Sequence, residues 1–110
     1  MVNEMNNDGC TALMYAADRG HIETVEMLID KGADINRASS NGSTPLMYAA
    51  LRGHVDTAVL LVESGADVSK KNFDGLTAHW LAMKTGHKDM AALLLQYGDD
   101  VHGKPFHLDF

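Results

Sequence analysis

The stretch that decides the fold covers residues 44–54 and reads Thr-Pro-Leu-Met-Tyr-Ala-Ala-Leu-Arg-Gly-His. Thr44 can accept a backbone N–H bond as a helix N-cap, and Pro45 suits the first helical position, where no N–H is needed. Gly53 tolerates the left-handed backbone conformation that ends many helices. The stretch therefore predicts a short helix that begins at Pro45 and ends near Gly53.

The residues that follow predict a second helix and then a turn. Val55, Ala58 and Leu61 are apolar and recur at the spacing of one helix face. Gly65 is expected to end this helix. The corresponding region of the preceding sequence, residues 33–42, is short, polar and rich in turn-forming residues, which predicts a projecting hairpin or tight turn. One unit therefore consists of a helix, a turn, a second helix and a finger.

The unit recurs three times along the chain with a period of 33 residues. Such self-similarity indicates a repeat architecture, in which each unit buries its apolar face against its neighbours. We expect a single domain over residues 1–110, with units at approximately 6–38, 39–71 and 72–102 and a tail at 103–110. The recurring positions are Gly9, Gly42 and Gly75; Thr11, Thr44 and Thr77; His21, His54 and His87; and Gly32, Gly65 and Gly98, which are expected to end the second helices.

The segments Thr44–Ala50 and Gly32–Asn36 resemble the ankyrin repeat family, which has a 33-residue period and a T-P-L-H-x-A signature. The resemblance covers nearly the whole chain. It implies an all-α solenoid of helix-turn-helix units with projecting β-hairpin or turn fingers. It also implies that a partner protein would contact the fingers and the concave helix face.

The chain departs from the family pattern at the histidine of that signature, where it has Met14, Met47 and Trp80. None of these side chains can hydrogen-bond as an imidazole does, so a polar tie between repeats is expected to be missing. Methionine and tryptophan fill space by packing, which predicts a looser or more apolar interface. We expect Trp80 to fill the interface between repeats two and three. The third unit is degenerate, with His79 in place of leucine and Met83 in place of alanine.

Composition and charge disfavour several classes of function. The chain has 110 residues, 45% of them apolar, and a formal net charge of −6, which disfavours a nucleic-acid binder that tracks phosphates. No apolar run approaches the roughly 20 residues that cross a bilayer, so no membrane insertion is expected. Cys10 has no partner cysteine, which fits a reducing, cytoplasmic or nuclear location.

The titratable residues predict no catalytic or metal site, and we expect neither enzyme activity nor a cofactor. The three recurring histidines would lie spread along the stack, whereas zinc needs ligands that converge on one point. Cys10 has no identifiable base beside it and is interpreted as a bystander thiol. No phosphate-loop, dinucleotide-binding or nucleophile-elbow motif occurs. The weaker alternative is an ion held near the tail by His102, His107 and Asp109.

Residues that vary between units at the fingertips and at the ends of the first helices are free to serve a partner, because stacking does not dictate them. Phe73 is the strongest anchor candidate, since aromatic residues often dominate interfaces. Arg19, Arg52 and Lys84 predict a short basic stripe that suits an acidic peptide. The recurring tyrosines are expected to pack between units. The predicted partner-binding residues are Asn7, Asp8, Asp18, Arg19, Ser40, Asn41, Ser43, Leu51, Arg52, Phe73, Asp74, Leu76, Lys84 and Thr85.

Two further segments carry predictions of their own. The sequence from Leu28 to Asn36 is similar to the one that asparaginyl hydroxylases modify in ankyrin hairpins, which makes Asn36 a candidate hydroxylation site. In the tail, Phe106, Leu108 and Phe110 alternate with polar residues and would share one side of an extended segment. We expect this tail to cap the third repeat, or else to be the cut edge of a longer array.

The sequence thus predicts a monomeric, non-catalytic module that binds another protein through fingertips and concave face, alone or within a larger adaptor or scaffold. A second interpretation within binding is an inhibitor that masks an enzyme's active site. A different class is an architectural fragment or spacer of a longer repeat array. A hydrolase or metal enzyme is the remaining class, which bound zinc on the purified protein would favour.

Overall fold

The computed structural model describes residues 2–102 of the chain, with side chains as far as Gly98. All regular secondary structure in this part is helical. The first unit contains α1 (Ala12–Arg19) and α2 (Ile22–Asp30), the second contains α3 (Pro45–Arg52) and α4 (Val55–Glu63), and the third contains α5 (Ala78–Lys84) and α6 (Lys88–His102).

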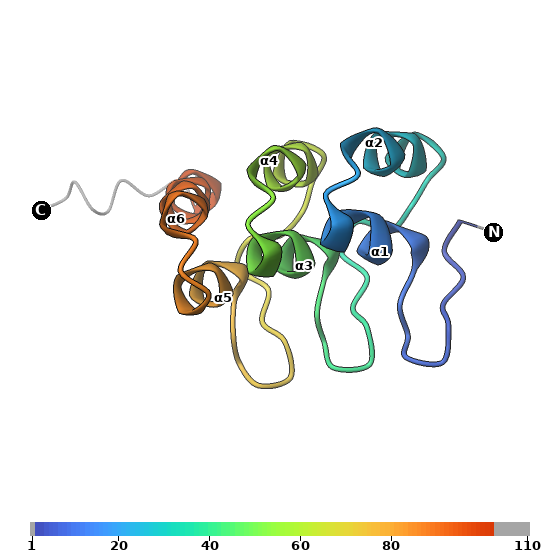
Figure 1. Cartoon of the computed structure of the whole chain (residues 1–110), viewed down its shortest axis with the longest axis horizontal. Coiled ribbons are helices and arrows are strands. Elements are labelled where there is room, and N and C mark those ends of the chain that lie inside the picture. Colours follow the sequence, from blue (N-terminus) through green and yellow to red (C-terminus); the bar gives the residue numbers. More distant parts are fainter. Residues whose placement is uncertain (1, 103–110) are drawn as a thin grey trace, which may run out of the picture.

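The helices form two parallel rows, as Figure 1 shows. Within each unit the two helices pack as a pair, and α1, α3 and α5 pack against one another in one row. The second row contains α2, α4 and α6, and three fingers project beyond the first row on its other side. This arrangement confirms the predicted all-α repeat solenoid, with fingers that are turns and carry no strand within residues 2–102.

The first helix of each unit begins as the sequence predicts. The hydroxyl of Thr44 accepts a hydrogen bond from the backbone N–H of Met47 at 3.4 Å, and α3 ends at Gly53, which has a φ of 78°. The Met47 sulfur also accepts from the Thr44 N–H at 3.4 Å, and Thr11 and Met14 repeat the arrangement in α1. Each methionine therefore closes the cap of its own helix while its side chain stays buried.

The prediction for Trp80 is wrong. Its side chain is 44% exposed, although Met14 and Met47 at the equivalent position are fully buried. The position faces the unit that follows, and no fourth unit covers it within the described part of the chain. Lys84 occupies part of this space, with its ammonium 5.3 Å from the centre of the indole ring.

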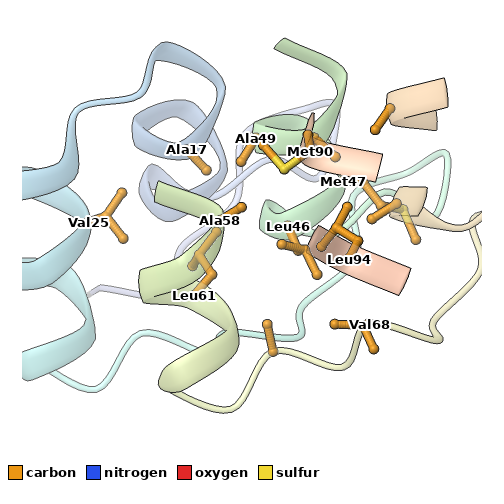
Figure 2. Close-up of a cluster of buried hydrophobic side chains, with 14 of the residues drawn as sticks. Ala17, Val25, Leu46, Met47, Ala49, Ala58, Leu61, Val68, Met90 and Leu94 are labelled. Carbon is orange, nitrogen blue, oxygen red and sulfur yellow. The ribbon is translucent and has the colours of Figure 1, made fainter. Parts of the chain in front are cut away.

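A single apolar core runs between the two helix rows and through all three units, as the close-up in Figure 2 shows. Val25 of α2 and Leu61 of α4 are fully buried, as are Met90 and Leu94 of α6 and Met47 of α3. Burial of each such side chain stabilises the fold by about 2 kcal/mol. Because these residues come from every unit, no unit has a core of its own.

Histidines fill the joints between units, which confirms the structural role expected for two of the three. The His54 ring lies against the backbone of Gly20, where an added Cβ would be only 2.7 Å from its Nδ1. Its Nε2 lies 3.0 Å from the carbonyl oxygen of Asp18 in the preceding unit. The His87 ring packs in the same way against Gly53.

Asparagine side chains join the loops that follow the second helices. The Asn36 amide donates from Nδ2 to the Gly65 carbonyl at 3.1 Å, and its Oδ1 accepts from the Asp67 N–H at 2.8 Å. Asn3, which lies 33 residues earlier, makes the same two bonds one unit earlier, to Gly32 and Asp34. Each asparagine therefore holds the loop of the next unit in its non-helical form.

The expectation that Gly98 ends its helix is wrong, because α6 continues through this glycine to His102. Ser69 occupies the position that is equivalent to Asn3 and Asn36, 33 residues after Asn36. Its Oγ donates to a carboxylate oxygen of Asp67 within its own unit at 2.7 Å. Its shorter side chain borders a cavity of about 250 Å³ that Gly98 also lines. The third unit therefore lacks the side chain that holds the corresponding loop in the first two.

Candidate protein-binding groove

The three fingers share one local construction. The N–H at the start of each finger donates to a carbonyl at its end, in the pairs Asn6 to Cys10, Ser39 to Ser43 and Asn72 to Leu76, at 2.9–3.0 Å. A glycine with positive φ sits at each tip. The fingers are therefore rigid loops of equal length at regular intervals, which is a geometry suited to recognition.

Backbone hydrogen bonds join neighbouring fingers at their tips. The N–H of Ser40 donates to the carbonyl of Asp8 at 3.0 Å, and the N–H of Phe73 donates to the carbonyl of Asn41 at 3.1 Å. The Phe73 ring lies over Gly42, where an added Cβ would come within 2.7 Å of it. Even so, Phe73 remains 76% exposed, the highest value among the exposed large apolar side chains described.

A small cavity of about 170 Å³ lies between α1 and α3, beside Cys10 at the end of the first finger. Its lining combines an apolar floor with a thiol, two phenol rings and an ion pair. Such a mixture, mostly apolar with a few placed polar groups, is typical of ligand and peptide pockets. The lining residues are Cys10, Met14, Tyr15, Asp18, Tyr48 and Arg52.

An ion pair between units forms one wall of this cavity. The Nε of Arg52 lies 2.9 Å from a carboxylate oxygen of Asp18, and the arginine side chain is still more than half exposed. Arg19 lies elsewhere, in a cavity of about 280 Å³ that Ala12 and His21 also line. The predicted basic stripe is thus interrupted, because Asp18 neutralises its middle member.

Tyr48 also lines the cavity, and its hydroxyl donates to the Ser39 hydroxyl at 3.2 Å. Its oxygen also lies 3.8 Å from the sulfur of Cys10, which belongs to the neighbouring unit. Burial raises the pKa of Tyr48 above its ordinary value of 10.0, so the phenol stays neutral at physiological pH and keeps its hydrogen bond to Ser39. Tyr48 therefore serves the joint between units, as expected of the recurring tyrosines.

Tyr15 differs from that expectation and is the groove residue that the sequence interpretation missed. It lines the cavity and is 46% exposed, and its hydroxyl accepts from the Asn6 amide at 2.6 Å. The repeat pattern gives Tyr15 the same position as Tyr48 and so predicts the same burial. Tyr48 is partly covered by the preceding unit, whereas no unit precedes Tyr15 in the described residues. Periodicity gives the position of a side chain in its unit, while exposure depends on the neighbouring unit.

Most of the predicted partner-binding residues lie on the surface, whereas Ser43 is buried. Its N–H bonds to the Asn41 side chain and its carbonyl accepts from Ser39, because this residue leads directly into the N-cap of α3. Leu51 and Leu76 are half-buried, as is Asp18. The exposed members of the set are Asn7, Asp8, Arg19, Ser40, Asn41, Arg52, Phe73, Asp74, Lys84 and Thr85.

Asn36, the candidate hydroxylation site, lies at the base of the fingers and away from the groove cavity. It is half-buried, and both ends of its amide bond to the next unit. Its modification stays a prediction. The alternative ion site rests on His107 and Asp109, which lie outside the described residues.

Two features of the described part of the chain bear on other functions. No group of three or more histidine, cysteine, aspartate or glutamate side chains there is placed so that it could hold a metal ion. No helix of residues 2–102 is long and apolar enough to cross a membrane.

The sequence model of the family described as ankyrin repeats (3 copies) matches residues 1–72 and again residues 37–105. The chain belongs to the ankyrin repeat family. The match covers all three helix pairs and their fingers. The resemblance inferred from the repeat signature and the fold inferred from it are therefore both confirmed.

Curated relatives match over about one repeat. The human NAD-capped RNA hydrolase NUDT12 is 53% identical over 34 residues, which are 31% of this chain and 7% of that protein. The Acyl-CoA-binding domain-containing protein 6 homolog of Dictyostelium discoideum is 43% identical over 35 residues, or 12% of its length. The chain thus spans a small part of these relatives.

Proposed function

We propose that this ankyrin repeat chain binds another protein in the groove between its fingers and its first helix row. Two observations carry the proposal: Phe73 is exposed at the tip of the third finger, on a row of hydrogen-bonded fingers, and a mostly apolar cavity lies between the first two units. Aromatic anchors and desolvated pockets supply most of the affinity in protein interfaces. The proposal includes no catalytic step and no cofactor, and it places the protein in the cytosol or nucleus, where the unpaired Cys10 stays reduced.

The groove fits a peptide with an apolar or aromatic anchor and a charged side chain next to it. Tyr15 supplies an exposed ring beside the cavity, and Tyr48 lines it from the second unit. The Asp18–Arg52 pair presents both charges, so a partner side chain of either sign meets an opposite charge within the groove. The expected partner segment therefore differs from the purely acidic peptide that a continuous basic stripe would favour.

The test is capture of binding proteins from cell lysate by the parent, by a groove variant and by an outer-face control. The groove variant combines Tyr15→Ala with Phe73→Ala. The control combines Met27→Ser with Val55→Ser, which are exposed residues of α2 and α4. Loss of one anchor side chain costs about 2 kcal/mol, or about 30-fold in Kd. A protein held by the parent and the control and lost by the folded groove variant supports the proposal. Equal retention by all three contradicts it.

A further inference from the structure

The third unit departs from the first two at three positions that meet in space. Ser69 stands where the earlier units are joined by Asn3 and Asn36, and His79 stands where they have a leucine. Gly98 lies inside α6, whereas its counterparts follow the ends of their helices. All three residues line one cavity of about 250 Å³, and so do Val68, Leu94 and Leu95. The three departures therefore form one local feature of the fold.

The cavity lies where the earlier units have larger or more deeply packed side chains. Leu13 and Leu46, the counterparts of His79, are each only 1% exposed, whereas His79 is half-buried. At the position of Asn36, which reaches across to the next unit, the shorter Ser69 bonds within its own unit. The third unit therefore leaves space open at a point that is filled in the first two.

The walls of this cavity are mostly apolar. Val68 and Leu94 belong to the buried core, as Figure 2 shows, and Leu95 forms a rim that is 55% exposed. An added Cβ on Gly98 would lie 3.7 Å from Cγ2 of Val68, so the glycine leaves room that a side chain would take. No charged side chain of the described residues lines the cavity. An uncharged occupant is therefore favoured, because a desolvated charge without a partner is costly.

His79 gives the cavity a hydrogen-bond acceptor of fixed orientation. Its Nδ1 lies 2.8 Å from the carbonyl oxygen of Ala91. A carbonyl oxygen can only accept, so Nδ1 carries the hydrogen and Nε2 of the neutral ring is an acceptor. Nε2 has no hydrogen-bond partner within the described residues, where every fully buried side-chain nitrogen or oxygen has one, so Nε2 is open to water.

The two hydroxyl groups in the lining already hold local structure. The Ser69 Oγ donates to Asp67, and the Thr77 Oγ1 accepts from the backbone N–H of Trp80 at 3.2 Å as the N-cap of α5. These hydroxyls therefore serve the loop and the helix end. His79 is the group that selects a ligand, and it favours one with an N–H or O–H donor.

The size of the cavity suits one aromatic side chain. An apolar cavity of about 150 Å³ holds a benzene molecule, so about 250 Å³ has room for a bicyclic ring. Pockets for whole small molecules usually exceed about 300 Å³. The exposed rim at Leu95 lets a ring enter while the chain that carries it stays outside.

We propose that this cavity binds the indole ring of a tryptophan side chain from a partner protein, with the indole N–H donating to Nε2 of His79. The ring packs on Val68 and Leu94, and Gly98 leaves room for it. This site shares no lining residue with the groove cavity and is independent of binding in the groove. The cap expected of residues 103–110 lies outside the described residues and is no part of this site.

Matched ring compounds test the hydrogen bond on the full chain. N-acetyl-tryptophanamide is the probe for a tryptophan side chain, indole is the ring alone, and benzofuran has the shape of indole with an oxygen in place of the N–H. We expect a Kd of about 1 mM for indole and about 5-fold weaker binding of benzofuran. Chemical shifts of the Val68 and Leu94 methyl groups and of the His79 ring nitrogens measure the binding.

Two variants separate the acceptor from the space. His79→Leu restores the residue of the first two units, and it should bind indole and benzofuran equally because the acceptor is gone. Gly98→Leu fills the cavity with His79 in place, and it should abolish the shifts of all three probes. Gln96→Leu puts the same residue at an exposed position of α6 outside the cavity and should bind as the parent does. Far-UV circular dichroism checks that each variant is folded.

Absence of shifts at Val68 and Leu94 in the parent would overturn the proposal. Equal binding of indole and benzofuran by the parent contradicts the hydrogen bond to His79, and full binding by folded Gly98→Leu contradicts the placement of the site. Binding of indole without binding of N-acetyl-tryptophanamide overturns the assignment to a side chain, since a free small molecule is then the occupant. The parent titrations alone keep the test decisive if a variant does not fold.

Discussion

The second and third units have equivalent surfaces on the side that faces the next unit. The surface of the second unit is covered by the third unit, whereas no described residue forms a unit that covers the surface of the third. At the joint, the His87 ring covers Gly53, and Met47 and Ala50 are buried. At the open end, an added Cβ on Gly86 would meet nothing within 4 Å, and the side chains equivalent to that methionine and alanine are exposed. One unit therefore contributes to stability mainly through the neighbour that covers it, as expected for a quasi-one-dimensional array.

The same comparison explains where the second helices end. α2 and α4 stop before Gly32 and Gly65. Asn3, which lies before the first unit, holds the loop at Gly32, and Asn36 of the first unit holds the loop at Gly65. α6 continues through Gly98, and the equivalent asparagine position holds a serine. A glycine thus permits a helix to end, while the bonds from the preceding unit decide that it does.

The largest expected difference between the covered joint and the open end is at their two glycines. Gly53→Ala places a methyl group 2.6 Å from the His87 ring at a φ of 78°, and Gly86→Ala has a similar φ of 83° with free space. We expect losses of about 3 kcal/mol for Gly53→Ala and about 1 kcal/mol for Gly86→Ala in the free energy of unfolding. Urea denaturation measures both. Equal losses in the two variants would show that the contact with His87 adds no cost beyond the backbone strain that both alanines share.

The asparagine bonds give the second difference. Asn36→Ala removes two hydrogen bonds between units and is expected to lower the free energy of unfolding by about 2 kcal/mol. Ser69→Ala removes one exposed bond within its own unit, for about 0.5 kcal/mol. Thermal and urea unfolding of the two variants, side by side, check this order. A Ser69→Ala loss as large as that of Asn36→Ala would contradict the role given to the asparagine.

Restoring the missing asparagine should make the third unit resemble the first two. Ser69→Asn supplies the side chain that holds the loop after α2 and α4, so we expect the helix to end near Gly98 and stability to rise by about 1 kcal/mol. Backbone chemical shifts of residues 99–102 are the readout, and they should leave the helical range. Helical shifts that stay unchanged would mean that another feature of the third unit extends α6.

The smallest effect concerns a tyrosine that a joint covers. Burial raises the pKa of Tyr48 in the folded protein. The contribution of the neutral phenol to the free energy of unfolding is therefore complete below pH 10.0 and is lost as the pH rises through the raised pKa. The free energy of unfolding of the parent should therefore fall more steeply above this pH than that of Tyr48→Phe. Tyr15→Phe, outside the joint, is the reference for removal of a phenol hydroxyl. Parallel profiles for the parent and Tyr48→Phe would contradict the assigned burial effect.

The sequence was sufficient for the helices, the repeat and the family, because each depends on local signals that recur three times. Thr44, Pro45 and Gly53 fix the ends of α3 by their own conformational preferences, and Thr11 and Gly20 do so for α1. These signals need no knowledge of the neighbouring unit. The bounds of the first five helices were therefore predictable.

The failures occur where the neighbouring unit decides the outcome. Trp80 was expected in an interface and is exposed, Gly98 was expected to end a helix and does not, and Ser43 was expected at the surface and is buried. The variable positions predict a binding region at the fingertips and the first helices, and this region stays a prediction. Its cavity depends on contacts across units, such as Asp18 with Arg52, which one repeat read alone does not contain.

Binding through the groove is the central claim, and site-specific photocrosslinking tests it most directly. A photoreactive phenylalanine analogue is placed at Phe73 on the fingers and, in a second chain, at the exposed Met27 on the outer row. Both chains are irradiated in the same lysate after equal melting temperatures are confirmed. The proposal predicts a discrete protein adduct from position 73 and none from position 27. An adduct from position 27 alone, or none from either position, would contradict recognition through the fingers and groove.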